Sequence, residues 1–325
     1  MSMPFYVSPE QSMRDKADYA RKGIARGRSC VALKYAGGIL MVAPNPSRAL
    51  HKIGELYDRI AFAAVGRYNE YENLRKAGVT YADITGFQYD RHDVTARGIA
   101  NWYAQTLGTI FTESNKPFEV EIVVAEIGLQ SADDQIYRIT FDGSVSDEPG
   151  FVALGGQTEQ VSAVLKERFR EGLPLAEAFG VALAALAAPS NGEQRPDVVA
   201  AQLEVAVLDR ARDHRTFRRI RTARLEELLG EVRAADQKAA DQKAADQKAA
   251  DQKAADQKAA DQKAADQKVA DEKAAEAANA EASGASETPA EPGPPDTGPS
   301  VGPDAASSDR GGGLNGGGDA PSSPL

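Results

Sequence analysis

The feature that most constrains the fold is the absence of aromatic side chains from the last part of the chain. No Phe, Tyr or Trp follows Phe217, and residues 234–325 consist largely of Ala, Gly, Pro, Ser and charged residues. Such a segment cannot bury enough apolar surface to offset the conformational entropy lost on folding. The charge divides at the same place: residues 1–233 hold 31 acidic and 29 basic side chains, whereas residues 234–325 hold 17 and 9. The globular part therefore ends near Arg233.

Composition also argues against several classes of protein. The single Cys30 excludes a disulfide framework, and His51, His92 and His214 lie too far apart in the sequence to predict a metal site. No apolar run reaches the ~18–20 residues that span a bilayer, and a nearly neutral body does not suit nucleic acid. The first residues lack the basic and apolar regions of a signal peptide. We therefore expect a cytoplasmic protein with no metal or other cofactor, no nucleic-acid partner and no membrane partner.

The apolar pattern before Arg233 predicts two groups of strands, each followed by a pair of helices. A first helix over residues 9–22 has Ser8 as its cap and Pro9 in its first turn. The expected strands cover residues 29–35, 39–43, 60–66, 118–127, 135–141, 150–154 and 203–208, and the expected helices residues 67–77, 94–114, 158–170, 173–188 and 221–229. This order predicts an α+β protein in which two sheets pack face to face and helices cover both outer faces, a four-layer αββα sandwich.

The tail opens with a repeat. The pentapeptide AADQK occurs seven times over residues 234–268, and the variant VADEK follows at residues 269–273. Ala, Gln and Lys favour helix, but a period of five residues places no apolar stripe along one face. We expect a loosely helical, solvated spacer over residues 233–273 and a disordered acidic tail over residues 274–325. Before this spacer, we expect an N-terminal segment over residues 1–8 and the folded domain over residues 9–232.

Several motifs occur in an order that identifies a family. Ser8-Pro9 precedes the first helix, Tyr19-Ala20-Arg21 lies within it, and a Gly-Gly hairpin, Lys52-Ile53 and Ala153-Leu154-Gly155-Gly156 follow. No single motif is specific, but their order over about residues 4–230 resembles the actinobacterial 20S proteasome alpha subunits. The resemblance implies an Ntn-hydrolase-type αββα fold, in agreement with the pattern of strands and helices.

The resemblance implies a subunit without catalytic residues of its own. The related beta subunits attack peptides with the hydroxyl of an N-terminal Thr, whose α-amine takes the proton. Here Arg28 stands at the position of that Thr, Pro44 lies near the position of the catalytic acid, and only Lys52 matches the catalytic Lys. Ser29 is a weak substitute because it has no α-amine beside it. The alternative, an active threonine- or serine-type hydrolase, would be revived by peptide hydrolysis by the isolated chain.

The resemblance also implies two functional regions. Lys52, with Gly27 and Gly66 beside it, would form a pocket that binds the C-terminus of an AAA ring ATPase. The residues before the first helix would close the entry pore; these are Met1, Ser2, Met3, Pro4, Phe5, Tyr6 and Val7, with Pro9 setting the turn into the helix. The arginine-rich segment over residues 210–224 is interpreted as a salt-bridged outer wall, because acidic residues interleave with it.

The implied assembly has seven alpha subunits per outer ring and fourteen alpha with fourteen beta subunits in all. It would degrade protein substrates that carry Pup, a small ubiquitin-like modifier. A third hypothesis is that the chain is a scaffold whose repeat tail is the functional part.

Overall fold

The strands form two antiparallel sheets of five. A computed structural model describes residues 8–188 and 199–283. Its strands are β1 (Cys30–Tyr35), β2 (Gly38–Pro44), β3 (Ile53–Tyr57), β4 (Ile60–Gly66), β5 (Val120–Glu126), β6 (Gln135–Ile139), β7 (Val145–Asp147), β8 (Phe151–Leu154), β9 (Leu203–Asp209) and β10 (Phe217–Arg219). One sheet has the order β10-β9-β2-β1-β8 and the other β3-β4-β5-β6-β7, with antiparallel pairing throughout. β3 and β10 are therefore edge strands.

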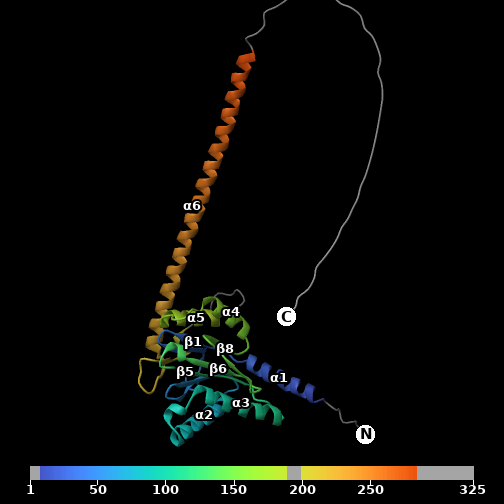
Figure 1. The fold of residues 1–325 in the computed structure, drawn as a ribbon, viewed down its shortest axis with the longest axis vertical. Helices are drawn as coiled ribbons and strands as arrows, with labels where there is room; N and C mark the ends of the chain where they lie inside the picture. The colour runs from blue at the N-terminus through green and yellow to red at the C-terminus, as the bar shows by residue number, and fades with distance from the viewer. Residues whose placement is uncertain (1–7, 189–198, 284–325) are drawn as a thin grey trace, which may run out of the picture. The chain divides into compact units, whose positions relative to one another are not determined.

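Helices cover the outer face of each sheet. The α-helices are α1 (Pro9–Ala25), α2 (Tyr68–Gln88), α3 (Ala96–Glu113), α4 (Thr158–Arg168), α5 (Leu175–Ala187) and α6 (Thr222–Ser283). Figure 1 shows α2 and α3 on one side of the paired sheets and α4 and α5 on the other. The predicted four-layer αββα sandwich is confirmed.

The layers explain why β2 is apolar at almost every position. Ile39 and Met41 point between the two sheets, whereas Leu40 and Val42 point to the cluster that includes α4, α5 and the start of α6. A strand covered on both faces reads as a continuous apolar run instead of an alternating one. The same reasoning holds for β4, where Phe62 belongs to the cluster beneath α2 and α3.

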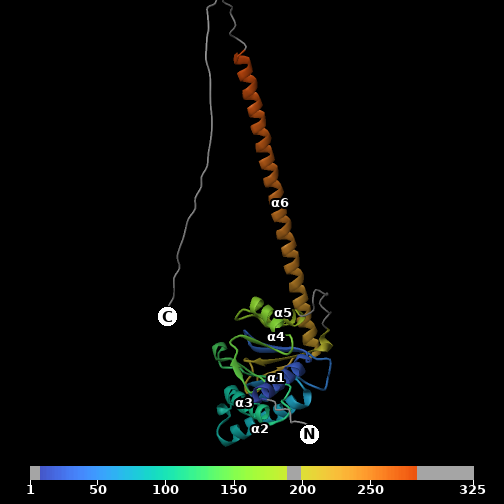
Figure 2. The same ribbon diagram turned by 90° about the vertical axis from the view of Figure 1, so that its right-hand side faces the viewer.

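α1 lies at one end of the sandwich and not over a sheet face (Figures 1 and 2). The Ser8 side chain accepts a hydrogen bond from the Gln11 amide (3.2 Å), and Pro9 occupies the first turn, where its missing N–H costs nothing. Ala20 and Ile24 are its buried residues, and both join the layer between the sheets. The helix therefore fixes the chain just before Gly27.

Two helices are longer than the pattern predicted. α2 continues past residue 77 to Gln88, and α6 runs from Thr222 through the repeat to Ser283 as one helix. Leu225, Leu228 and Leu229 of α6 are buried, whereas every residue from 233 to 276 is exposed. Contacts between residues divide the chain into two compact units, and the boundary after Ala249 falls within this helix. Residues 284–325, the larger part of the expected disordered tail, lie outside the described residues.

Candidate functional site

The Lys52 side chain lies at a corner formed by the starts of β1 and β3. It is half-buried, and its Nζ donates a hydrogen bond to the carbonyl oxygen of Arg28 (2.8 Å). Burial lowers the pKa of Lys52, Arg28 lowers it further, and the nearby Cys30 and Glu204 oppose the shift. The ammonium therefore stands in a partly desolvated position.

Gly27 and Gly66 meet at the same corner. Gly66 ends β4 with φ of 109°, and a Cβ on it would overlap the carbonyl oxygen of Glu119. A Cβ on Gly27 would lie 3.3 Å from the amide nitrogen of Gly66, so the two backbones approach closely. Arg28, whose carbonyl accepts from Lys52, directly follows Gly27. The structure thus brings the three predicted pocket residues together.

One residue of this corner was not singled out from the sequence. The buried Glu204 of β9 accepts hydrogen bonds from Asn45 Nδ2 (2.7 Å) and from the amides of Lys52 (2.9 Å) and Ile53 (3.3 Å). It also pairs with Arg219 and lies 3.2 Å from His51 Nδ1. Its signal in the sequence is an acidic residue within an otherwise apolar strand.

The positions that align with the catalytic centre of the beta subunits lie at the starts of β1 and β3 and at the end of β2. Arg28 is exposed, Ser29 is half-buried at the start of β1, and Pro44 ends β2. Lys52 Nζ faces a peptide carbonyl of a continuous chain at this point. The seven residues Met1 to Val7, predicted to close the pore, lie outside the described residues; Pro9 is the first residue of α1.

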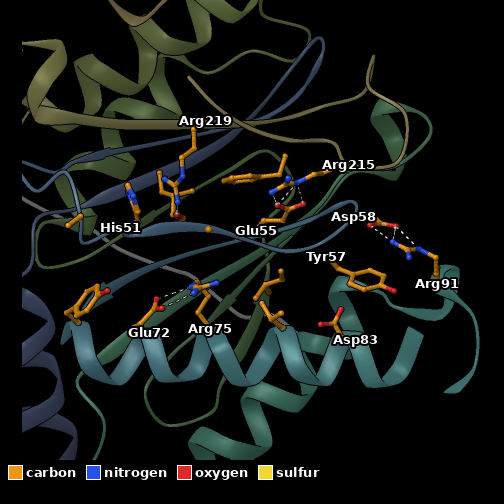
Figure 3. Close-up of a pocket in the computed structure, with 17 residues that line it drawn as sticks. His51, Glu55, Tyr57, Asp58, Glu72, Arg75, Asp83, Arg91, Arg215 and Arg219 are labelled. Carbon is orange, nitrogen blue, oxygen red and sulfur yellow. Dashed lines mark hydrogen bonds and ion pairs between the residues drawn. The ribbon is translucent and has the colours of Figure 1, made fainter. Parts of the chain in front are cut away.

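A groove of about 570 Å³ runs beside β3, between α2 and residues 215–219. Figure 3 shows that most of its charged side chains form ion pairs with one another. The pairs are Glu72 with Arg75 (2.8 Å), Glu55 with Arg215 (2.5 Å) and Asp58 with Arg91 (2.6 Å). These pairs leave little free charge for a ligand.

The arginine-rich segment is held mainly by ion pairs, as the sequence indicated. Arg210 binds the fully buried Asp134 (2.6 Å), and Arg224 binds Glu227 (2.8 Å). Over residues 8–188 and 199–283, no group of His, Cys, Asp and Glu is arranged to hold a metal ion. The same ranges contain no helix whose length and hydropathy would let it cross a bilayer.

Two antiparallel sheets packed between helical layers define an αββα sandwich of the Ntn-hydrolase type. Residues 24–207 match the family model described as "Proteasome subunit". A protein named proteasome subunit alpha from Streptosporangium roseum is 70% identical over 232 residues, which is 71% of this chain and 88% of that protein. Proteins of the same name from Thermomonospora curvata and Thermobifida fusca are 66% and 64% identical; each alignment covers 71% of this chain, with 99% and 92% of those proteins. The chain belongs to the proteasome subunit family, among its alpha subunits.

Proposed function

We propose that this chain forms the outer heptameric rings of a 20S proteasome, admits substrates, and docks a ring ATPase, without hydrolysing peptides itself. Family membership supports assembly with other proteasome subunits. The non-catalytic role is supported by the corner itself, where Lys52 donates to the Arg28 carbonyl of a continuous chain and the nearby Cys30 thiol is buried and protonated. The beta subunits would supply the N-terminal threonines.

The docking role rests on one observation: a half-buried lysine held beside two closely approaching glycine backbones. A terminal carboxylate suits this arrangement because charge-assisted hydrogen bonds are about twice as strong as neutral ones. The missing side chains of Gly27 and Gly66 let the chain segments of this corner pack closely, which holds the Arg28 carbonyl and Lys52 together at the proposed binding position. The proposed partner is the C-terminus of an AAA ring ATPase, which in a cytoplasmic setting would deliver proteins tagged with Pup.

The test uses the complex of this chain with its beta subunits. We expect Lys52→Ala and Lys52→Glu to abolish ATPase-dependent protein degradation while the basal cleavage of small peptides is kept. Lys166→Ala, in the last turn of α4, is the matched control because that lysine is exposed and far along the chain from the corner. Docking that survives both Lys52 changes would show that the pocket is wrongly assigned.

The gate and the assembly are tested separately. Deletion of residues 2–7 should speed the entry of small peptides when no activator is present, and unchanged rates would argue against a gate. Native mass spectrometry should find fourteen copies of this chain with fourteen of a smaller partner. A monomer that hydrolyses peptides alone would instead support the hydrolase alternative.

A further inference from the structure

We propose that Glu204 is a positioning residue that fixes the backbone of Lys52 in the geometry needed for docking. The inference rests on the proposed docking function of Lys52. It concerns a side chain that lies on β9, in the sheet opposite to the β3 strand that Lys52 precedes. Glu204 therefore ties the two sheets together at the corner where the candidate pocket lies.

The carboxylate holds both ends of the connection between β2 and β3. At one end it accepts from Asn45 Nδ2 (2.7 Å), and the same amide group donates to the carbonyl of Leu50 (2.7 Å). At the other end it accepts from the backbone amides of Lys52 and Ile53. Because β3 is an edge strand, amides at its start lack a neighbouring strand on one side. The buried Glu204 carboxylate thus accepts the hydrogen bonds of two amides that no neighbouring strand accepts on this side of β3.

The Glu204 carboxylate is buried and paired with an arginine. Only 8% of Glu204 is exposed, yet the Arg219 guanidinium pairs with it and also donates to the carbonyl of Ile53. Figure 3 shows Arg219 and His51 near one another at one end of the groove beside β3. A buried carboxylate that is paired and fully hydrogen-bonded rigidifies its surroundings, whereas a half-satisfied one is costly. The network is therefore suited to holding one backbone conformation.

A fixed backbone matters because the Lys52 side chain has four rotatable bonds. Its Nζ donates to the Arg28 carbonyl (2.8 Å), and a backbone held at the Lys52 amide reduces the number of conformations from which that contact must form. A lysine that is already ordered loses less conformational entropy when it binds a carboxylate, and preorganisation of this kind appears directly as affinity. Loosening Glu204 should weaken docking without touching any atom that contacts the peptide.

The experiment compares Glu204→Gln with Glu121→Gln in the assembled complex. Glu121 is an equally buried carboxylate (4% exposed) that binds Arg138 and the Gly155 amide (3.0 Å), and it is not among the charges that act on Lys52. The probe is a short fluorescent peptide copied from the ATPase C-terminus, with its C-terminal amide as a negative control. We expect the Kd to rise about tenfold in Glu204→Gln, the size of a lost charge-assisted hydrogen bond, and to stay unchanged in Glu121→Gln.

A pH profile separates positioning from mere destabilisation. Among the described residues, the groups whose charge acts on the Lys52 ammonium are Arg28, Cys30 and Glu204. The Glu204 charge raises the pKa of Lys52, so its removal should lower that pKa and move the loss of docking at alkaline pH to a lower pH. The titration is repeated with His51→Gln in both backgrounds, so that this neighbour of Glu204 does not contribute. A purely structural defect would lower the melting temperature without moving the profile.

Each outcome decides one proposal. Peptide binding that survives Lys52→Ala refutes the docking function itself. Loss of binding in Lys52→Ala, with unchanged affinity and pH profile in Glu204→Gln, refutes the positioning role alone. If Glu204→Gln fails to assemble, Asn45→Ala decides instead. It removes one donor from the same carboxylate and should raise the Kd about threefold, about half of the free energy of a tenfold change. An unchanged Kd in that variant overturns the inference.

Discussion

Gly66 offers the sharpest test of how the candidate pocket is built. Replacement by alanine forces an L side chain to adopt φ of 109°, which costs about 1–2 kcal/mol. The new Cβ would also overlap the carbonyl oxygen of Glu119 on the neighbouring chain segment. That carbonyl accepts the Arg67 amide (2.9 Å), so it cannot move without breaking a second contact. Overpacking of this kind adds about 1–3 kcal/mol. The total for Gly66→Ala is therefore about 3 kcal/mol of lost stability.

Two other glycines separate the cost of the positive φ from the cost of the close contact. Gly172 has a positive φ of 74° with nothing within 4 Å of its built Cβ, so Gly172→Ala should cost about 1 kcal/mol. Gly27 lacks the positive φ and meets only 3.1 Å and 3.3 Å contacts, so Gly27→Ala should also cost little. At about 2–4 °C per kcal/mol for a domain of this size, Gly66→Ala should melt about 10 °C lower.

The assay follows the fluorescence of Trp102, the only tryptophan of the chain, during thermal unfolding. This residue stacks on Tyr81 between α2 and α3 (5.2 Å between ring centroids), so it reports on the folded body and not on the helical repeat. Equal melting temperatures for Gly66→Ala and Gly172→Ala would refute the reasoning. They would mean that the close approach to Glu119 plays no part in the requirement for glycine.

Two further predictions concern the thiol and the tail. Burial raises the pKa of Cys30 to about 12, so the thiol is protonated at neutral pH; it should react slowly with a disulfide reagent in the native protein and quickly in urea, and a fast native reaction would contradict the burial. A chain ended after Arg233 should melt within about 2 °C of the full chain by Trp102 fluorescence while far-UV circular dichroism loses helical signal, because residues 234–276 are exposed throughout. A large fall in melting temperature would show that the repeat stabilises the body.

The sequence predicted the strands that are covered on both faces and the edge strand β8, and it missed the other edge strands, β3, β7 and β10. β2 and β4 carry continuous apolar runs because each is buried between the other sheet and a helical layer. β10 has only three residues, two of them arginines, and its pairing with β9 depends on tertiary context. Local composition carries no signal for a strand that is defined by its neighbour.

The length of α2 also depended on tertiary contacts. Gly78 lies where the predicted helix stopped, and glycine inside a helix ordinarily costs about 1 kcal/mol. In the fold a Cβ there would overlap the Tyr103 hydroxyl, which donates to the carbonyl of Leu74 (3.0 Å). Gly78 is therefore a packing requirement and not a break. Beyond Gly78, the apolar side chain of Phe87 is 91% exposed, so it does not belong to a buried face from which a longer helix could be predicted.

The continuous α6 has a local explanation in the spacing of side chains within the repeat. Asp and Lys within the AADQK repeat lack the favourable i, i+4 spacing, but Gln and Asp have it between successive repeats. Gln237 donates to Asp241 (3.0 Å) and Gln242 to Asp246 (3.2 Å). Such pairs stabilise a helix by about 0.2–0.5 kcal/mol each, which adds up along a repeat and explains a helix without an apolar face.

The Lys52 corner is the place where stability and function should separate. A half-buried ammonium is costly to desolvate, and apolar residues of similar volume often replace buried charges at no loss of stability. Here the Arg28 carbonyl accepts from the ammonium and the charge of Glu204 favours the protonated lysine, and the Arg28 contact closes no strand pair within a sheet. A lysine kept only for folding would make Lys52→Ala clearly destabilising, with docking lost in proportion. A lysine kept for a ligand would leave the melting temperature nearly unchanged while docking fails. The ratio of the two effects in one variant therefore distinguishes a structural residue from a binding residue, and we expect it to favour binding.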